Sequence, residues 1–469
     1  MNIDLHEDFL QNTTFGELRI GQGATIHRAL SEEDIEGFAA LSGDVNPTHL
    51  DEAYAIAQGL HGRTAHFMWC GAMVSSVLGT VFPGPGTTYV EQRMRFLGSV
   101  RAGDQLEITV RVTAKDPATA LVVLDCSVRR QGGELLMSGE AVVKAPVEKQ
   151  RVARMNGLVW HVFDAAAGVQ GLLGQARSHP PLCCAIVHPC DAESLRGALD
   201  AARHGLFTPI IVAPRDRILA VAAEAQLDLG NAIIENVAHS HAAAERAAAL
   251  AAAGEVQALM KGSLHTDELM KAVLARPELR TKRRLSHVFR FDVPAYKKPL
   301  FVTDAALNIA PNLDEKRHIA QNAIDLVRAL GTQTPKVAVL AAVESVNATM
   351  PCTLDAAALA KMADRGQITG GIVDGPLAFD NAISLQAAQT KGIVSPVAGD
   401  PDILLVPDLV SGNILAKQLE YLAGAMGSGV VVGARVPIAL TSRADGATAR
   451  LASAALAVLL ANSYRLQPL

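Results

Sequence analysis

The chain has 469 residues, of which 49% are hydrophobic and 19% charged, and its formal net charge is −5. This length exceeds that of one ordinary domain and predicts two or three domains, each with enough apolar material for a core. The negative charge balance, without a long run of Lys or Arg, argues against nucleic acid as a main partner.

The first informative element is a predicted helix that begins at the capping sequence Ser31–Asp34 and continues at helical spacing to Leu41. It ends in a short turn that contains Asp44, Asn46 and His49, with a proline after Asn46 that favours the turn. Such a turn can aim the carboxylate and the imidazole into one cavity, which is the minimum equipment for adding or removing water. The alternative is an ordinary helix-ending turn with Asp44 as a cap.

The next segments predict a helix wrapped by antiparallel strands. Residues 66–78 are apolar on nearly all sides and rich in small side chains, which indicates a buried helix. Strand-like segments follow at residues 87–96, 105–112, 120–129 and 135–144.

On these motifs, residues 10–145 resemble the MaoC-like, (R)-specific enoyl-CoA hydratase family, which has the hotdog fold. The resemblance implies that Asp44 and His49 are the catalytic pair that activates a water for attack on C3 of a trans-2-enoyl-CoA. It also implies substrate-binding roles for Asn46, Phe67 and Ser75. The sequence departs from the family at Phe67, where a glycine is usual, and this ring either narrows the acyl pocket or disturbs the oxyanion site.

The pattern changes after the last of these strands. A connector over residues 148–180 is expected, with a helix over 152–176. From residue 182 onward, apolar strands alternate with helices, which predicts an α/β fold with a mostly parallel sheet covered by helices on both faces. Polar loops follow several strands, and at the carboxyl ends of parallel strands such loops line a ligand crevice. Lys261 and Arg443 in these loops suit an anion, although each loop alone also fits ordinary turn chemistry.

Residues 182–469 resemble the phosphate acetyltransferase/phosphate butyryltransferase family, nearer the butyryl branch. The runs MKGSLHTDEL, FVTDAALNIAP, VPDLVSGNILAKQLEYLAGA and ALTSRAD are of that type. The resemblance implies two α/β subdomains and transfer of an acyl group between CoA and phosphate. The implied site residues are Ser442 and Arg443 as catalytic groups, and Lys261, Ser263, Thr266, Asn308 and Asn413 as substrate-binding groups. The acetyl branch has an aspartate where this chain has Ala449, and Asp445 is the nearest substitute base.

The sequence therefore predicts a MaoC-like hotdog domain over residues 1–147, a connector over 148–180 and a transferase domain over 181–469. We expect two activities, enoyl-CoA hydration and acyl transfer to phosphate, on CoA thioesters and inorganic phosphate without a bound cofactor. Two alternatives stay open: a transferase whose hotdog domain only binds acyl-CoA or supports oligomerisation, and a scaffolding protein with both sites silent.

Further expectations concern surroundings and partners. The polar first residues lack a signal-peptide core, no apolar run has membrane-spanning length without a charge or a breaker, and the six cysteines show no disulfide spacing. We therefore expect a cytoplasmic protein with no membrane partner. His61 and His66 are interpreted as core or supporting histidines, so no metal is expected. A homo-oligomer, a dimer or larger, is expected because hotdog domains usually pair at their sheet edges.

Overall fold

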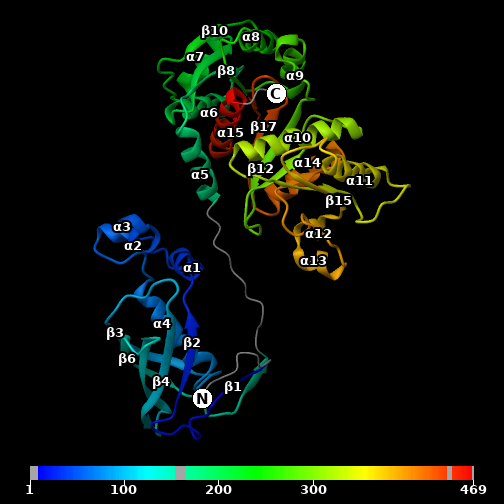
Figure 1. Ribbon diagram of the computed structural model, residues 1–469. Coiled ribbons are helices and arrows are strands. Elements are labelled where there is room, and N and C mark those ends of the chain that lie inside the picture. Colours follow the sequence, from blue (N-terminus) through cyan, green and yellow to red (C-terminus); the bar gives the residue numbers. More distant parts are fainter. Residues whose placement is uncertain (1–8, 154–164, 441–445, 467–469) are drawn as a thin grey trace. The chain divides into compact units, whose positions relative to one another are not determined.

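The computed structural model of the chain describes residues 9–153, 165–440 and 446–466. These residues form two compact units, an N-terminal unit that ends at Phe163 and a C-terminal unit that begins at Asp164. Each unit has its own core and is described by itself (Figure 1).

The N-terminal unit is an antiparallel sheet around one long helix. Its elements are β1 (Phe9–Gln11), β2 (Gly23–Ala29), α1 (Glu32–Ser42), α2 (Pro47–Leu50), α3 (Glu52–Ala57), α4 (Phe67–Thr80), β3 (Thr88–Phe96), β4 (Gln105–Asp116), β5 (Leu121–Arg130), β6 (Leu135–Lys144) and β7 (Arg151–Ala153). The five-stranded sheet has the order β2-β4-β5-β6-β3, and β1 pairs separately with β7. The alternating buried residues of β4 and β5 pack against one face of α4, which is the hotdog arrangement predicted from the sequence.

Two details differ from the sequence-based expectation. The helix over residues 66–78 was expected to be buried on nearly all sides, but α4 buries only the face that carries Trp69, Val74 and Leu78. Phe67 and Met68 are about half exposed, at 46% and 54%. Strand β2, which the sequence analysis did not predict, closes the sheet beside β4.

The C-terminal unit contains an eleven-stranded sheet with helices packed against it. Its elements are α5 (Ala165–Arg177), β8 (Leu182–Val187), α6 (Ala192–Arg203), β9 (Phe207–Ala213), α7 (Arg215–Glu224), β10 (Ile233–Asn236), α8 (Ser240–Ala252), β11 (Ala258–Lys261), α9 (Thr266–Leu274), η1 (Pro277–Leu279), β12 (Ser286–Asp292), β13 (Leu300–Thr303), α10 (Leu313–Ala329), β14 (Lys336–Leu340), α11 (Pro351–Asp364), β15 (Ile372–Leu377), α12 (Phe379–Ile383), α13 (Leu385–Thr390), β16 (Ile403–Leu405), α14 (Leu409–Tyr421), β17 (Met426–Val432), β18 (Ile438–Ala439) and α15 (Ala447–Leu466). The strand order is β10-β9-β8-β11-β18-β17-β12-β13-β16-β14-β15. The predicted α/β fold with a mostly parallel sheet is confirmed.

The two halves of this sheet run in opposite directions. Strands β8 to β11 and β18 are mutually parallel, and β13 to β16 are mutually parallel. Antiparallel pairing of β17 with β18, of β12 with β17 and of β12 with β13 reverses the direction between the halves. Strands β11 and β18 therefore end at the edge of the sheet opposite to the one where β13 ends. From the sequence, the polar loops after these strands were expected to line one ligand crevice, because the apolar pattern of a strand does not show its direction.

The start of the expected connector helix is a strand instead. Residues 151–153 form β7, which pairs with β1, and α5 covers Ala165–Arg177. Helix α5 packs against α15, so it belongs to the C-terminal unit. Within the described ranges, no helix combines the length and apolar character needed to cross a membrane.

Two candidate active sites

The turn between α1 and α2 is built by local capping. Ser31 and Asp34 form the predicted capping box at the start of α1, and Gly43 ends this helix with a left-handed φ of 74°. Asn46 caps α2 by accepting a hydrogen bond from the Thr48 N–H at 3.1 Å. Asp44 lies between these two caps, and its Oδ1 accepts a bond of 3.3 Å from the Asn46 N–H. The role of Asn46 visible in the structure is to shape the turn that holds Asp44.

His49 and Asp44 face each other across this turn. The Nε2 of His49 lies 4.0 Å from the Oδ2 of Asp44, and the imidazole is 11% exposed against 56% for the carboxylate. The Nδ1 of His49 donates to the backbone carbonyl of Thr64 at 2.7 Å. A carbonyl only accepts, so this bond places the proton on Nδ1 and leaves the Nε2 lone pair directed toward Asp44. Two hydrogen-bond acceptors at this separation can both bind one water molecule.

His66 holds the other side of this turn. Its Nε2 donates to the backbone carbonyl of Asp44 at 2.8 Å, and its ring contacts that of His49 with the centroids 3.8 Å apart and the planes tilted by 32°. The Phe38 ring of α1 contacts the His66 ring, with centroids 5.1 Å apart. His66 is 3% exposed, and its Nδ1 is buried without a hydrogen-bond partner among the described residues. A core or supporting role was predicted for His66, but the sequence around it does not predict its bond to Asp44.

One ligand atom from each of Asp44, His49 and His66 lies within 4.8 Å of the others. Each histidine donates one ring N–H to a backbone carbonyl, so the Nε2 of His49 and the Nδ1 of His66 carry lone pairs. These lone pairs and the Asp44 carboxylate are acceptors for a water molecule, and their spacing would also admit a metal ion.

The first two residues of α4, Phe67 and Met68, are exposed. His66 is the N-cap of this helix and makes no side-chain cap bond, so in the described part of the chain nothing accepts from the N–H groups of Phe67 and Met68. The Phe67 ring turns to Phe96 of β3, with ring centroids 5.2 Å apart. Ser75, predicted to lie near a thioester, is exposed on α4, about 12 Å along the helix from its first turn by the usual rise per residue.

In the C-terminal unit, the loops that follow β8 and β11 are joined by hydrogen bonds. Val187 of β8 pairs with Lys261 of β11, which brings the two strand ends together. The Ser263 hydroxyl donates to the His188 carbonyl at 2.9 Å and accepts from the Cys190 N–H at 3.0 Å. Lys261 is 5% exposed, and its Nζ donates to the Gly262 carbonyl at 3.3 Å.

Glycine is required between Lys261 and Ser263. A Cβ at Gly262 would lie 2.6 Å from the Val187 carbonyl oxygen and 2.7 Å from that of His188. Backbone packed this closely holds the loop in one position. The fixed loop therefore determines where the buried Lys261 side chain begins.

Asp191 and Arg450 support this loop from behind. Burial raises the pKa of Asp191, but hydrogen bonds from Ser194 and Ser263 and the nearby charge of Arg450 outweigh it, so the pKa falls below the usual value. Arg450, on α15, is 2% exposed and packs its side chain against Gly197 of α6. Neither residue was predicted from the sequence, although Asp191 directly follows the apolar strand β8 and its turn.

Other predicted site residues are placed differently. Asn308 is buried, donates to the carboxylate of Asp304 at 2.6 Å and to the Leu285 carbonyl at 2.9 Å, and accepts from Arg284. It lies near the start of β12, away from the edge where β11 ends. Asn413 is exposed on α14 and donates to the Ala305 carbonyl at 3.2 Å.

Of the remaining predicted residues, only Thr266 lies within the described parts of the chain. Thr266 is the first residue of α9 and is half-buried. Ser442, Arg443 and Asp445 lie outside the described residues. Because β18 is parallel to β11 and beside it, the chain enters residues 441–445 at the edge where the Lys261 loop lies.

A buried histidine lies in β12, one of the central strands of the sheet. His287 is fully buried, and among the described residues neither ring nitrogen has a hydrogen-bond partner. Burial lowers the pKa of His287 to about 3, an effect that the Leu440 carbonyl only partly offsets. The ring is neutral at physiological pH and lies against Gly429 and Leu440.

Comparison with known proteins agrees with this geometry. The family model described as Phosphate acetyl/butaryl transferase matches residues 238–458, and the model described as MaoC like domain matches residues 18–129. A protein named phosphate acetyltransferase from Rhizobium meliloti is 58% identical over 295 residues, which cover 63% of this chain and 93% of that protein. The chain belongs to the phosphate acetyl/butyryltransferase family. It carries a MaoC-like domain in addition.

Two further relatives of the transferase domain are more distant. A protein named probable phosphate butyryltransferase from Bacillus subtilis (strain 168) is 44% identical over 300 residues, 63% of this chain and 99% of that protein. The crystal structure of a branched-chain phosphotransacylase from Enterococcus faecalis V583 matches with a TM-score of 0.53 and 30% identity, covering 60% of this chain and 99% of that one. The transferase domain is therefore matched over nearly the full length of these relatives.

Proposed function

We propose that the chain is a two-activity enzyme that acts on acyl-CoA thioesters. The MaoC-like domain hydrates trans-2-enoyl-CoA to (R)-3-hydroxyacyl-CoA, and the transferase domain moves a short acyl group between CoA and inorganic phosphate. The observation that best supports the first activity is the pairing of the His49 Nε2 with the Asp44 Oδ2 at 4.0 Å, with the proton fixed on Nδ1.

In the proposed hydration, one water donates hydrogen bonds to Asp44 and His49. This orients an oxygen lone pair toward C3 of the enoyl group, and His49 or Asp44 takes the proton as the C3–O bond forms. The electron pair moves toward the thioester oxygen, where the free N–H groups of Phe67 and Met68 at the start of α4 can stabilise negative charge. The proton is then delivered to C2 by the same pair.

In the proposed transfer, a phosphate oxygen attacks the thioester carbonyl carbon, the C–S bond breaks and CoA thiolate leaves. A thiolate is a good leaving group, so the reaction depends mainly on alignment of two anions and on stabilisation of the oxyanion. Lys261 is proposed to attract phosphate at the edge where β11 ends. By the family resemblance, Arg443 binds the phosphoryl group, Ser442 bonds to the thiol or the intermediate, and Asp445 is the candidate base.

A second function is favoured by Phe67. Phe67 stands at the start of α4, where the family usually has glycine, and its ring contacts that of Phe96 in β3. If the ring prevents thioester binding, the MaoC-like domain serves as an acyl-CoA-binding or oligomerisation module, and the chain is a phosphate acyltransferase only.

The test is hydration of crotonyl-CoA by the full chain, followed by loss of absorbance of the conjugated thioester. Asp44→Asn is expected to abolish hydration and to leave phosphate-dependent CoA release from acyl-CoA unchanged. Glu33→Gln, at an exposed position on α1, is the matched control and should keep both activities. Wild-type protein that transfers acyl groups but hydrates no faster than Asp44→Asn would refute the two-activity proposal.

Transfer is tested with Lys261→Gln against Lys282→Gln, an exposed lysine outside the predicted site. Lys261→Gln should raise the KM for phosphate and lower kcat, because a buried cation is lost beside the incoming anion. Equal kinetics for the two variants would remove Lys261 from the proposed site.

A further inference from the structure

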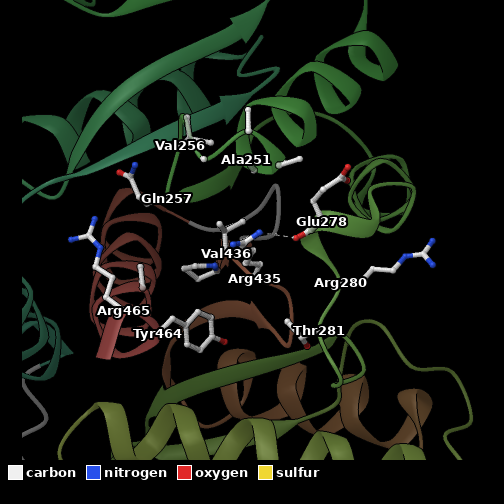
Figure 2. A pocket seen from close by; sticks show the side chains of 15 residues that line it. Ala251, Val256, Gln257, Glu278, Arg280, Thr281, Arg435, Val436, Tyr464 and Arg465 are labelled. Atoms are coloured by element: carbon white, nitrogen blue, oxygen red, sulfur yellow. Dashed lines mark hydrogen bonds between the residues drawn. The ribbon is translucent and has the colours of Figure 1, made fainter. Parts of the chain in front are cut away.

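The transferase domain contains a cavity that is separate from the proposed transfer site. It has a volume of about 670 Å³, within the range of small-molecule sites. It lies between the last turns of α8 and α15 and the segments that lead into β11 and β18 (Figure 2). Its lining residues are Ala251, Ala252, Ala253, Gly254, Val256, Gln257, Glu278, Arg280, Thr281, Arg435, Val436, Pro437, Ala461, Tyr464 and Arg465.

The cavity is at the opposite edge of the sheet from Lys261. Gln257 immediately precedes β11, and Pro437 immediately precedes β18, so both mark the amino ends of these parallel strands. Lys261 and residues 441–445 follow the carboxyl ends of the same strands. A ligand in the cavity would therefore approach from the side of the sheet opposite to the proposed transfer site.

Three arginines give the cavity a positive charge. Arg435 lies in the middle, with Arg280 and Arg465 on opposite sides of it (Figure 2). Within the described parts of the chain none of the three forms an ion pair, and Glu278 is the one acidic residue of the lining. Arg280 donates through Nε and Nη2 to the Leu274 carbonyl, and Arg435 only makes a long bond of 3.5 Å from Nη1 to the Glu278 carbonyl.

The rest of the lining contains small apolar residues and one aromatic ring. Val256 and Val436 are buried, and the ring of Tyr464 lies below Arg435 in the view of Figure 2. Guanidinium groups bind phosphate oxygens through paired hydrogen bonds, and an aromatic ring stacks on flat ring systems. The combination suits a ligand with both a charged phosphate end and a flat apolar end.

We propose that this cavity is a binding site for a nucleoside diphosphate, with the diphosphate on Arg435 and Arg465 and the base against Tyr464. A purely structural role for the arginines is the competing explanation. Helix C-termini carry partial negative charge, and arginines near them neutralise it. Arg280 already does this for α9 through the Leu274 carbonyl, and Arg465 lies in the last turn of α15, whereas Arg435 makes only its long bond to the Glu278 carbonyl in the described structure.

The experiment is calorimetric titration of the full chain with ADP and, separately, with adenosine. The variants are the double substitution Arg435→Gln/Arg465→Gln, a control double substitution Arg203→Gln/Arg246→Gln at other surface arginines, and Lys261→Gln. Loss of two charge-assisted contacts is expected to weaken ADP binding at least tenfold in the first variant. The control and Lys261→Gln should bind like the wild type, and adenosine should bind at least tenfold more weakly than ADP.

Several results would overturn the proposal. These are absence of ADP binding to the wild type at millimolar concentration, equal binding by Arg435→Gln/Arg465→Gln, and adenosine binding as tight as that of ADP. Because ADP is also a fragment of CoA, binding that is lost in Lys261→Gln but kept in the arginine variant would assign it to the transfer site instead. Phosphate-dependent CoA release by the arginine variant shows that the variant is folded.

Discussion

The bond from His66 to the Asp44 carbonyl leads to a sharp prediction about hydration. His66 is 3% exposed, and its Nε2 donates at 2.8 Å to the backbone of the residue whose carboxylate is proposed to hold the water. His66→Leu leaves the carbonyl without its donor, at a cost of about 1–3 kcal/mol. If this cost is expressed as misplacement of Asp44 in the transition state, kcat for crotonyl-CoA falls roughly 5- to 150-fold, since 1.36 kcal/mol is tenfold in rate.

The matched variant is His66→Gln. The glutamine amide nitrogen reaches about as far from the backbone as the histidine Nε2, so it can still donate to the Asp44 carbonyl, and the buried Nδ1 that it removes has no partner to lose. We expect His66→Gln to retain most of the kcat that His66→Leu loses, with phosphate-dependent CoA release unchanged in both. Equal loss in the two variants would show that ring contact with His49, rather than the hydrogen bond, positions the turn. If His66→Leu hydrates crotonyl-CoA as fast as the wild type, a positioning role for His66 is refuted.

Three further predictions concern both domains. Gly262→Ala should lower acyl transfer at least tenfold, because its Cβ would lie 2.6 Å from the Val187 carbonyl oxygen; Gly171→Ala on α5, where a Cβ meets nothing within 4 Å, is the control and should transfer normally. In the folded state the pKa of His287 is about 3, below its ordinary value near 6.5. Between these two pH values the unfolded chain binds a proton that the folded chain does not. The free energy of unfolding therefore falls by about 1.4 kcal/mol per pH unit as the pH drops from about 6.5 toward 3. His287→Gln should therefore flatten the fall of the transferase unfolding midpoint between pH 6.5 and 4.5, and a slope equal to that of the wild type would contradict the assigned pKa. Phe67→Gly should gain hydration of crotonyl-CoA if the ring blocks the site, whereas efficient hydration by the wild type would exclude the binding-module interpretation.

The sequence by itself determined the features that depend on short-range chemistry. The capping box at Ser31, the turn at Asn46 and four of the five strands of the hotdog sheet were predicted with nearly correct bounds, and only β2 was missed. Caps, turns and strand periodicity are set by residues within a few positions of one another, so they can be read without the fold. The motif runs of the transferase domain likewise indicate its family without knowledge of the fold.

The tertiary structure alone decided which distant groups meet. The proton on His49 is fixed by the Thr64 carbonyl, the turn of Asp44 is held by His66, and the Lys261 loop is joined to β8 through Ser263. These bonds connect residues 15, 22 and 75 positions apart, and no local pattern encodes them. The reversal of direction at β12, which separates Asn308 from the Lys261 loop, has the same origin, because strand direction follows from how the whole sheet is assembled and not from the residues within any one strand.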